Sequence, residues 1–468
     1  MAKSKALTVS AVGLSVMLAL GACSNGNSSS NATKTAAPAN TSSASADASG
    51  DNGGTATASP SDSPPSDSFD MGGREIRIAT WWDATPTADT PAGKASLDQL
   101  KAVEKKYNVK IKYLNVPYDQ FTSKFTSTVL AGDPFADIVN YEYRWAIPAI
   151  VNGQMLKMSE YTDPEDDINT TQKILVKSLP VLGDDYAISG APGAGGGGLF
   201  YNRDLFKKMG LPDLHEIVDQ GDWTWAKFEE IAKEATRDTD NDGKTDVWGT
   251  SGWSEELAQF LISSNGGAKI ADDATGKEGI SDPRTVEALN FLNQLYADKV
   301  VRVKGKEINN YTERDTFTDG NVAMAYGWDW MAGAYQGKFD YGMVPFPKGP
   351  QGTDYTFPSG GGGWFMPKGV KDPIQVFKIY EELANIPPVD EYPGQTWLEQ
   401  TVFKHQDDVD TMLKDINGKQ TLQVYGAFDG LKFGDAITDI VSKHQSVSSV
   451  VEKYKQPFQD AIDKIYKK

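Results

Sequence analysis

Apolar residues recur with two different periods in the stretch that begins at residue 74. Ile76 and Ile78 alternate with charged residues, and a second alternating stretch covers residues 109–114, so both are predicted to be β-strands. The helical spacing of three or four positions appears in two groups of apolar residues, namely Leu97, Leu100, Val103 and Tyr107, and then Phe121, Phe125 and Val129. A helix stop at Gly132 precedes a third apolar strand at residues 138–139. This alternation of strands and helices predicts a parallel sheet and an α/β fold.

Aromatic and charged residues follow two of these predicted strands. They are Trp81, Trp82 and Asp83 after the first strand, and Tyr141, Glu142, Tyr143 and Arg144 after the third. Parallel sheets carry their ligand sites at the carboxyl ends of strands, so these residues are predicted to line a ligand site. Strand alternation sends only one of Trp81 and Trp82 to a given face, and any single tryptophan can belong to the core instead.

Further helices are predicted from capping residues that precede apolar stripes. Asp282 with a following proline precedes one such stripe, and Asp372 with a following proline precedes another, so both aspartates are expected to act as helix caps. Trp225 belongs to the apolar stripe of a helix that begins after Thr224, and we therefore assign it to the core.

The first 23 residues have the pattern of an export signal. Two lysines precede an apolar run over residues 6–20 that is too short to span a bilayer, so residues 1–22 are predicted to be a signal peptide. Small residues then precede Cys23, the only cysteine of the chain, and this arrangement resembles the lipobox of bacterial lipoproteins. The resemblance implies acylation of Cys23, as with palmitate, and a location on the outer face of the cell membrane. An ordinary signal peptide with an incidental cysteine is the alternative.

The composition after Cys23 predicts a tether followed by an acidic soluble body. Residues 24–68 contain no aromatic or large aliphatic residue, so residues 23–73 are predicted to be a flexible linker. The formal net charge of −18 becomes −20 once residues 1–22, with two lysines and no acidic residue, are removed. Such a charge disfavours nucleic acid and anionic lipid as partners, because both require clustered cations.

A run of glycines over residues 193–198 precedes a short strand at residues 199–201. It formally matches a dinucleotide fingerprint, but the next helix begins only near Asp204, so the glycines do not open a helix that could receive a pyrophosphate. Glycine favours a hinge or a close approach of backbone at this place, and a floppy surface loop is the alternative.

Five segments in order resemble family 1 extracellular solute-binding proteins, the receptors of carbohydrate ABC importers. The segments are LFYNRDLFKKMGLP (199–212), the TW, DNDGKTD and WG motifs within residues 224–249, FTDGNVAMAYGW (317–328), YGMVPFPKGP (341–350) and GGGWFMPK (361–368). The resemblance implies a two-lobe type II periplasmic-binding-protein fold, each lobe a mixed β-sheet flanked by helices and joined by crossover hinge segments. It implies an N-terminal lobe of residues 74–197 and 360–400, and a C-terminal lobe of residues 198–359 and 401–468.

The same resemblance implies a monomeric receptor that delivers a neutral mono- or oligosaccharide to ABC permease subunits. Sugars present flat C–H faces ringed by hydroxyls, so their sites combine aromatic plates with carboxylate, amide and arginine groups. Besides the strand-end residues above, the predicted site includes Trp253, Glu255, Trp328, Asp329, Trp330 and Trp364. Trp328 matches the family position that stacks on sugar.

Alternatives are a surface lipoprotein that binds or hydrolyses glycans, and a binding protein for a non-sugar solute. The three histidines, His215, His405 and His444, have no metal-ligand spacing, and the chain has no nucleophile elbow or phosphate loop, so we expect no enzyme and no required cofactor.

One acidic segment has the spacing of a calcium loop. Asp238, Asp240, Asp242 and Asp246 stand at positions 1, 3, 5 and 9, and the carbonyl of Lys244 stands at position 7. Position 12 is a glycine in place of the usual glutamate, so a structural Ca²⁺ and a solvated acidic turn both remain open.

The variant Cys23→Ala tests the lipid anchor. We expect a folded protein that is released from the membrane, because the acyl chains are the only anchor that the sequence predicts. Fractionation of cells into membrane and soluble material measures this, and retention of the variant in the membrane fraction would contradict the prediction.

Overall fold

The computed structural model describes residues 69–161, 176–178, 182, 185–188, 196–304, 316–387, 389–390 and 394–467. The predicted signal peptide, Cys23, nearly all of the predicted linker and residues 193–195 of the glycine run lie outside the described residues. Across the described ranges, every helix is too short or too polar to traverse a bilayer.

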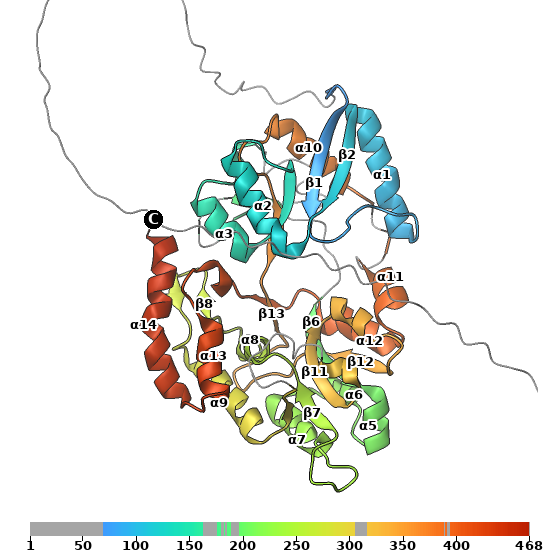
Figure 1. Cartoon of the computed structure of the whole chain (residues 1–468). Coiled ribbons are helices and arrows are strands. Elements are labelled where there is room, and N and C mark those ends of the chain that lie inside the picture. The colour runs from blue at the N-terminus through green and yellow to red at the C-terminus, as the bar shows by residue number, and fades with distance from the viewer. Residues whose placement is uncertain are drawn as a thin grey trace, which may run out of the picture. The chain divides into compact units, whose positions relative to one another are not determined.

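The first sheet has six strands in the order β2-β1-β3-β14-β5-β4, and Figure 1 labels its neighbouring strands β1 and β2. Its strands are β1 (Arg74–Thr80), β2 (Val109–Asn115), β3 (Ile138–Glu142), β4 (Val176–Ser178), β5 (Asp185–Ile188) and β14 (Gly362–Phe365). β1 pairs in parallel with β2 and β3, which confirms the parallel arrangement predicted for these three strands. β14 joins β3 and β5 in antiparallel fashion, so the sheet is mixed.

The helices beside this sheet are α1 (Pro91–Tyr107), α2 (Tyr118–Leu130), α3 (Tyr143–Val151) and α10 (Pro373–Ala384). Val103, Tyr107, Phe121 and Phe125 are buried, as their spacing predicts. Thr90 caps α1 by accepting a hydrogen bond from the backbone N–H of Gly93. α1 packs against α10, so a segment near residue 380 completes the first sheet's helical cover.

The second sheet has five strands in the order β10-β7-β11-β6-β12. Its strands are β6 (Gly197–Asn202), β7 (Trp248–Ser251), β10 (Val301–Arg302), β11 (Val322–Trp328) and β12 (Tyr341–Val344). β11 is parallel to β7 but antiparallel to β6, so this sheet is also mixed. Two small sheets pair β13 (Phe357–Ser359) with β15 (Gln420–Leu422) and β8 (Ala271–Asp272) with β9 (Lys277–Glu278).

Helices and single turns accompany the second sheet. They are α5 (Arg203–Met209), α6 (Leu214–Asp219), α7 (Trp225–Ala235), α8 (Ser254–Ser264), α9 (Pro283–Ala297), η3 (Asp329–Ala334), α11 (Gln395–Trp397), η4 (Leu398–Val402), α12 (Gln406–Thr411), η5 (Met412–Ile416), η6 (Tyr425–Ala427), α13 (Phe433–Val441) and α14 (Val447–Tyr466). η1 (Met158–Glu160) lies beside β5 of the first sheet. The C-terminal helices α13 and α14 pack on α8 and α9. The lobe boundaries stay a prediction.

Trp225 lies in the core, as predicted. It is 3% exposed, its ring stacks on Phe291 with centroids 4.8 Å apart, and its Nε1–H donates to Ser264 Oγ.

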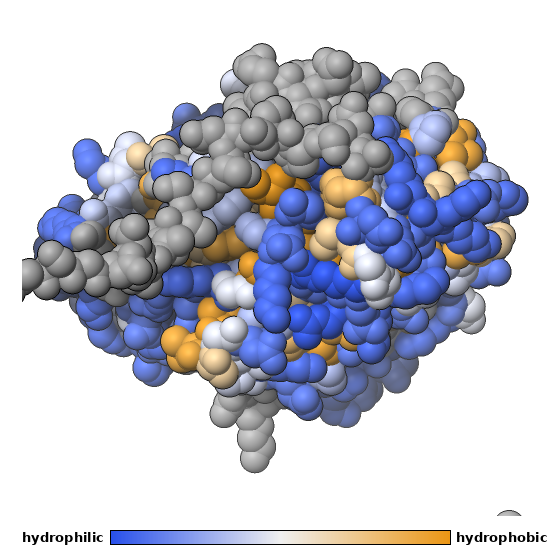
Figure 2. Space-filling model, turned by 90° about the horizontal axis from the view of Figure 1, so that it is seen from above, coloured by the Kyte–Doolittle hydropathy of each residue, from blue (hydrophilic) through white to orange (hydrophobic). Residues whose placement is uncertain are grey.

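Hydrophilic residues predominate on the face drawn in Figure 2, and apolar residues appear there only in small groups.

The two predicted aspartate caps differ. Asp282 caps α9 by accepting from the backbone N–H of Arg284. Asp372 precedes α10 but makes no capping hydrogen bond, because its backbone is left-handed (φ 50°) and its carboxylate pairs with Arg74 at 3.0 Å. The cap predicted at Asp372 is therefore wrong, although the helix begins at the predicted place.

In the described part of the glycine run, the backbone packs closely against neighbouring elements and does not form a surface loop. Gly197 and Gly198 belong to β6 and are buried. A Cβ atom on Gly198 would lie 2.4 Å from the carbonyl oxygen of Val344, and one on Gly196 would lie 2.5 Å from the side chain of Ile416. These distances leave no room for a methyl group.

Gly198→Ala tests this packing, with Gly333→Ala as the matched control. Gly333 is exposed, and a Cβ there would meet no atom within 4 Å. We expect Gly198→Ala to lower the free energy of unfolding by about 1–3 kcal/mol through overpacking, and Gly333→Ala to change it by less than about 0.5 kcal/mol. Urea unfolding of the purified body measures both. Equal unfolding midpoints for the two variants would show that a methyl group fits at position 198 without overpacking.

Candidate ligand-binding site

An aromatic cluster forms where β1 ends. The half-buried ring of Trp81 meets the rings of Trp82, Tyr118 and Trp145 edge-on, with centroids 5.0, 5.7 and 5.6 Å away. Trp82 is 42% exposed, so the two neighbouring indoles differ in environment, as strand alternation predicts. Trp81 thus supports the cluster, and Trp82 presents an apolar surface to solvent.

Tyr118 belongs to this cluster although its sequence position drew no prediction. It is 42% exposed, and its ring lies 4.8 Å from that of Trp145. Its hydroxyl donates to Glu142 at 3.1 Å. Tyr118 follows the carboxyl end of β2 by three residues, so the strand-end rule that selected Trp81 could have found it.

Glu142 and Arg144 form an ion pair beside the aromatic cluster. The Arg144 guanidinium lies 5.2 Å from the Trp145 ring and also contacts the hydroxyl of Tyr118. Burial raises the pKa of Glu142 to about 7, and the adjacent guanidinium acts in the opposite direction. The pair presents both an acceptor and donors next to exposed aromatic rings.

Two other residues of the same segment lie elsewhere. Tyr141 is 2% exposed and packs 4.8 Å from the ring of Phe125, so it is a core residue and the prediction that it contacts ligand is corrected. The cause is the period of two in β3, which turns Tyr141 inward beside the outward Glu142. Tyr143 is half-buried, and its backbone N–H donates to the carbonyl of Gly361.

Asp83 and Trp364 flank the exposed indole of Trp82. Trp364, in β14, is half-buried, and its ring lies 6.5 Å from Trp82 and 5.6 Å from Tyr380 in the core. Asp83 is exposed, and hydrogen bonds from the side chain and backbone of Thr85 lower its pKa. Asp83 therefore remains ionised at the rim of the cluster.

A second group of aromatic residues lies where β11 ends. Trp328 is half-buried, with its ring 5.1 Å from Phe260 and parallel to Trp330 at 6.0 Å. Trp330 is 60% exposed, whereas Asp329 between them is only 7% exposed. Burial raises the pKa of Asp329 to about 6.

Trp253 and Glu255 lie at the start of α8. Trp253 is half-buried, and its carbonyl accepts from the hydroxyl of Tyr326 at 2.9 Å. Glu255 accepts from the hydroxyl of Tyr425 at 2.8 Å, and burial raises its pKa. Tyr425 was not predicted, because it lies in the short turn η6, where no strand or helix period marks it.

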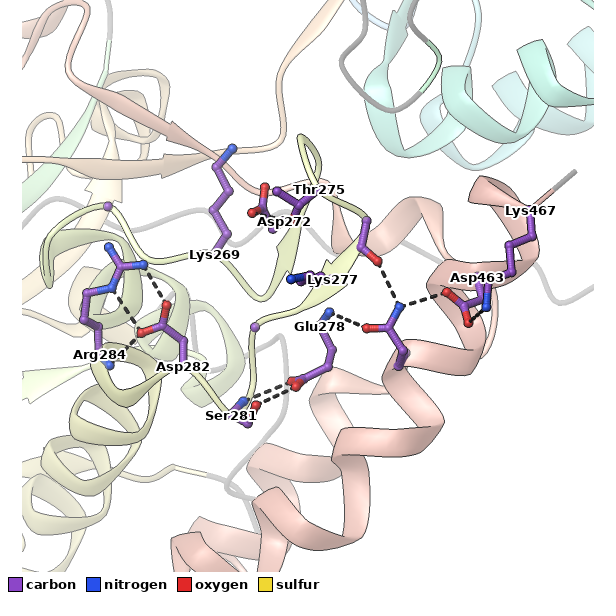
Figure 3. Close-up of a pocket in the computed structure, with 14 residues that line it drawn as sticks. Lys269, Asp272, Thr275, Lys277, Glu278, Ser281, Asp282, Arg284, Asp463 and Lys467 are labelled. Atoms are coloured by element: carbon purple, nitrogen blue, oxygen red, sulfur yellow. Dashed lines mark hydrogen bonds and ion pairs between the residues drawn. The ribbon is translucent and has the colours of Figure 1, made fainter.

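A hollow among the described residues lies away from these aromatic groups. It encloses about 830 Å³ between the β8–β9 hairpin, the start of α9 and α14 (Figure 3). Two ion pairs lie among its charged lining residues: Arg284 with Asp282, and Lys467 with Asp463. None of its described lining residues is aromatic, so they provide no flat ring for a sugar face.

The predicted calcium loop brings three of its acids together. Oxygens of Asp238, Asp240 and Asp246 lie within 4.8 Å of one another. The carboxylate of Asp242 instead contacts Lys244 twice: it accepts from the backbone N–H of Lys244 and pairs with its ammonium group, both at 2.8 Å. Calcium binding stays a prediction, and Asp242 would have to turn to serve as a ligand.

A second group of potential ligands is His215, Asp407 and Asp408. The guanidinium of Arg203 lies 2.9 Å from Asp407 and 3.0 Å from Asp408, so this side chain already supplies the cation. These ion pairs and hydrogen bonds connect α5, α6 and α12. Because Arg203 occupies the position of a cation, the group is not a metal site in this arrangement.

Two α/β units with mixed sheets, and aromatic and charged residues at their strand ends, define the class of two-lobe binding proteins. The family model of bacterial extracellular solute-binding proteins matches residues 86–385, which is more than half of the chain. The chain therefore belongs to this family.

Relatives by sequence include the maltodextrin-binding protein MdxE of Bacillus subtilis (strain 168), 26% identical over 196 residues, or 40% of this chain and 43% of that one. A maltooligosaccharide ABC transporter solute-binding lipoprotein of Streptococcus pneumoniae (strain TIGR4) is 23% identical over 37% of this chain and 39% of that one. The chain thus matches less than half the length of these curated relatives.

Solved structures share the fold over most of the chain. The cyclic α-maltosyl-1,6-maltose binding protein from Arthrobacter globiformis has a TM-score of 0.59 at 17% identity, covering 84% of this chain and 100% of that one. The GacH receptor of Streptomyces glaucescens has a TM-score of 0.57 at 17% identity, covering 84% and 99%. These similarities confirm the two-lobe α/β fold predicted from the sequence.

A thermal melt in excess Ca²⁺ and in chelator tests the acidic loop. We expect Ca²⁺ to raise the melting temperature, because it offsets the repulsion among Asp238, Asp240 and Asp246 and binds the folded form alone. Asp240→Asn should abolish this calcium-dependent shift in melting temperature. The control Asp133→Asn, at an exposed position outside the loop, should retain the shift. Identical melts of the wild type in both buffers would identify the loop as a solvated turn.

Proposed function

We propose that this protein is an extracytoplasmic, lipid-anchored receptor for a neutral mono- or oligosaccharide, which it holds between its lobes and delivers to an ABC transporter permease. The observation that carries the proposal is the exposure of Trp82 and Tyr118 beside the Glu142–Arg144 ion pair, at the ends of adjacent strands.

The chemistry of this grouping suits a sugar. An indole or phenol ring offers a flat apolar surface for the C–H face of a pyranose. Each hydroxyl removed from water needs a partner, and Glu142 supplies an acceptor while Arg144 supplies donors. Trp328 and Trp330, at and after the end of β11, offer further aromatic rings, and Glu255 in α8 offers a further acceptor.

The relatives and the net charge support the same ligand class. The names of the relatives from Bacillus and Streptococcus refer to maltodextrin and maltooligosaccharide. A formal charge of −18 opposes the approach of anionic solutes, whereas a neutral sugar experiences no such repulsion. The lipid anchor at Cys23 would keep the receptor near its permease.

Calorimetric titration with maltotriose and mannotriose tests the proposal. Trp328→Ala should weaken binding roughly tenfold to a hundredfold, since stacking and the hydrogen bonds that it positions are worth about 1–3 kcal/mol. Trp82→Ala should weaken binding in the same direction, because we place its indole on the same ligand.

Trp225→Phe is the matched control, because Trp225 is a buried tryptophan of the core. It should lower the melting temperature and leave affinity unchanged. If Trp328→Ala lowers the melting temperature with affinity intact, Trp328 is a core residue. Binding of a non-sugar solute alone, or turnover of the glycan, would assign the protein to another class.

A further inference from the structure

Asp329 is a buried carboxylate that makes a closed pair of hydrogen bonds with one glycine. Its backbone N–H donates to the carbonyl of Gly196 at 3.1 Å, and its Oδ2 accepts from the Gly196 N–H at 3.2 Å. Its Oδ1 accepts from the backbone N–H of Trp330 at 2.7 Å. One side chain thus joins the start of β6 to the turn between the two indoles.

The residues joined in this way also contact one another. Gly197 pairs with Trp328 at the end of the β6–β11 ladder, and a Cβ on Gly197 would lie 3.1 Å from the Trp328 indole. Trp330 stacks parallel to that indole. Gly197 therefore contacts Trp328 directly, and Asp329 links the adjacent Gly196 to the backbone of Trp330.

Within the described part of the chain, the elements around Asp329 bring no cation to its carboxylate. β6, β11 and β13 carry no charged residue. The charged residues of the neighbouring turns η4 and η5 are Glu399, which is exposed and bonds Gln395, and Lys414 and Asp415, which contact each other at 3.9 Å. Two backbone amides are thus the recorded polar partners of the carboxylate.

Stability alone does not account for a carboxylate at this place. Burial raises the pKa of Asp329 from 3.8 to about 6, so the ionised form is disfavoured in the folded protein. For a raised carboxyl pKa, ionisation subtracts from folding stability as pH increases from about 4 to above 6. At neutral pH the charge therefore costs stability while it supplies two acceptor oxygens.

We propose that Asp329 is a positioning residue for ligand binding, whose ionised carboxylate holds Gly196, Trp328 and Trp330 in one arrangement. The inference rests on the proposed function and adds a dependence on pH to it. A protonated carboxyl offers one good acceptor in place of two, so one of the two backbone amides loses its partner below pH 6.

Asp329→Asn reproduces the protonated state permanently, because its amide also offers one acceptor. In titrations with maltotriose from pH 5 to 8, the wild type should bind roughly three- to tenfold more weakly at pH 5 than at pH 8, since a charge-assisted hydrogen bond is lost. The variant should show the weaker affinity at pH 8 and a flatter profile. Its melting temperature at pH 8 should equal or exceed that of the wild type.

Glu142→Gln removes another carboxyl of the site whose pKa burial raises, and Glu255 stays unchanged in both variants. The inflection near pH 7 should disappear in this variant, and the one near pH 6 should persist, which tests Asp329 even if Asp329→Asn does not fold. Parallel pH profiles of the wild type and Asp329→Asn, or the absence of an inflection near pH 6 in Glu142→Gln, would overturn the inference while leaving sugar binding established. A wild type that binds no sugar at any pH would overturn the proposed function and this inference together.

Discussion

The second sheet depends on a strand whose first residues have no side chains. β6 lies between β11 and β12, and a methyl group on Gly196, Gly197 or Gly198 would collide with Ile416, Phe357 or the backbone of Val344. These three neighbours belong to β12, β13 and η5, so three separate elements meet at the glycine backbone. Tight packing of this kind tolerates little change in volume, so it fixes the end of β11 and the indoles that follow it.

Much of the fold was predictable because its signals are local. The period-two stretch at Ile76 and Ile78 and the helical spacing of Phe121 and Phe125 are visible within a few residues, and the structure confirms both. The antiparallel addition of β14 to β3 was not visible, because the partners are more than two hundred residues apart and neither strand encodes its neighbour. The resemblance to a family supplied that architecture.

The candidate site was predictable to the level of segments rather than side chains. The strand-end rule found the segment of Glu142 and Arg144, but the buried Tyr141 shows that a segment's position does not determine which of its residues face solvent. Asp329 was selected as a ligand contact, whereas its partners are backbone amides that no sequence pattern reveals. Tyr425 lies in a turn, and its hydrogen bond to Glu255 is likewise a tertiary contact that no local pattern reveals.

Four of the tryptophans form two pairs with opposite exposure. Trp223 and Trp225 are 0% and 3% exposed, whereas Trp82 and Trp330 are 42% and 60% exposed. Indoles in an apolar interior emit at shorter wavelength than hydrated ones, and an aqueous quencher reaches the hydrated ones alone. The red edge of the emission therefore reports on exposed indoles, which include Trp82 and Trp330 at the strand ends and Trp397 in α11. The blue edge reports on the core, so one spectrum follows both surface events and unfolding without an added label.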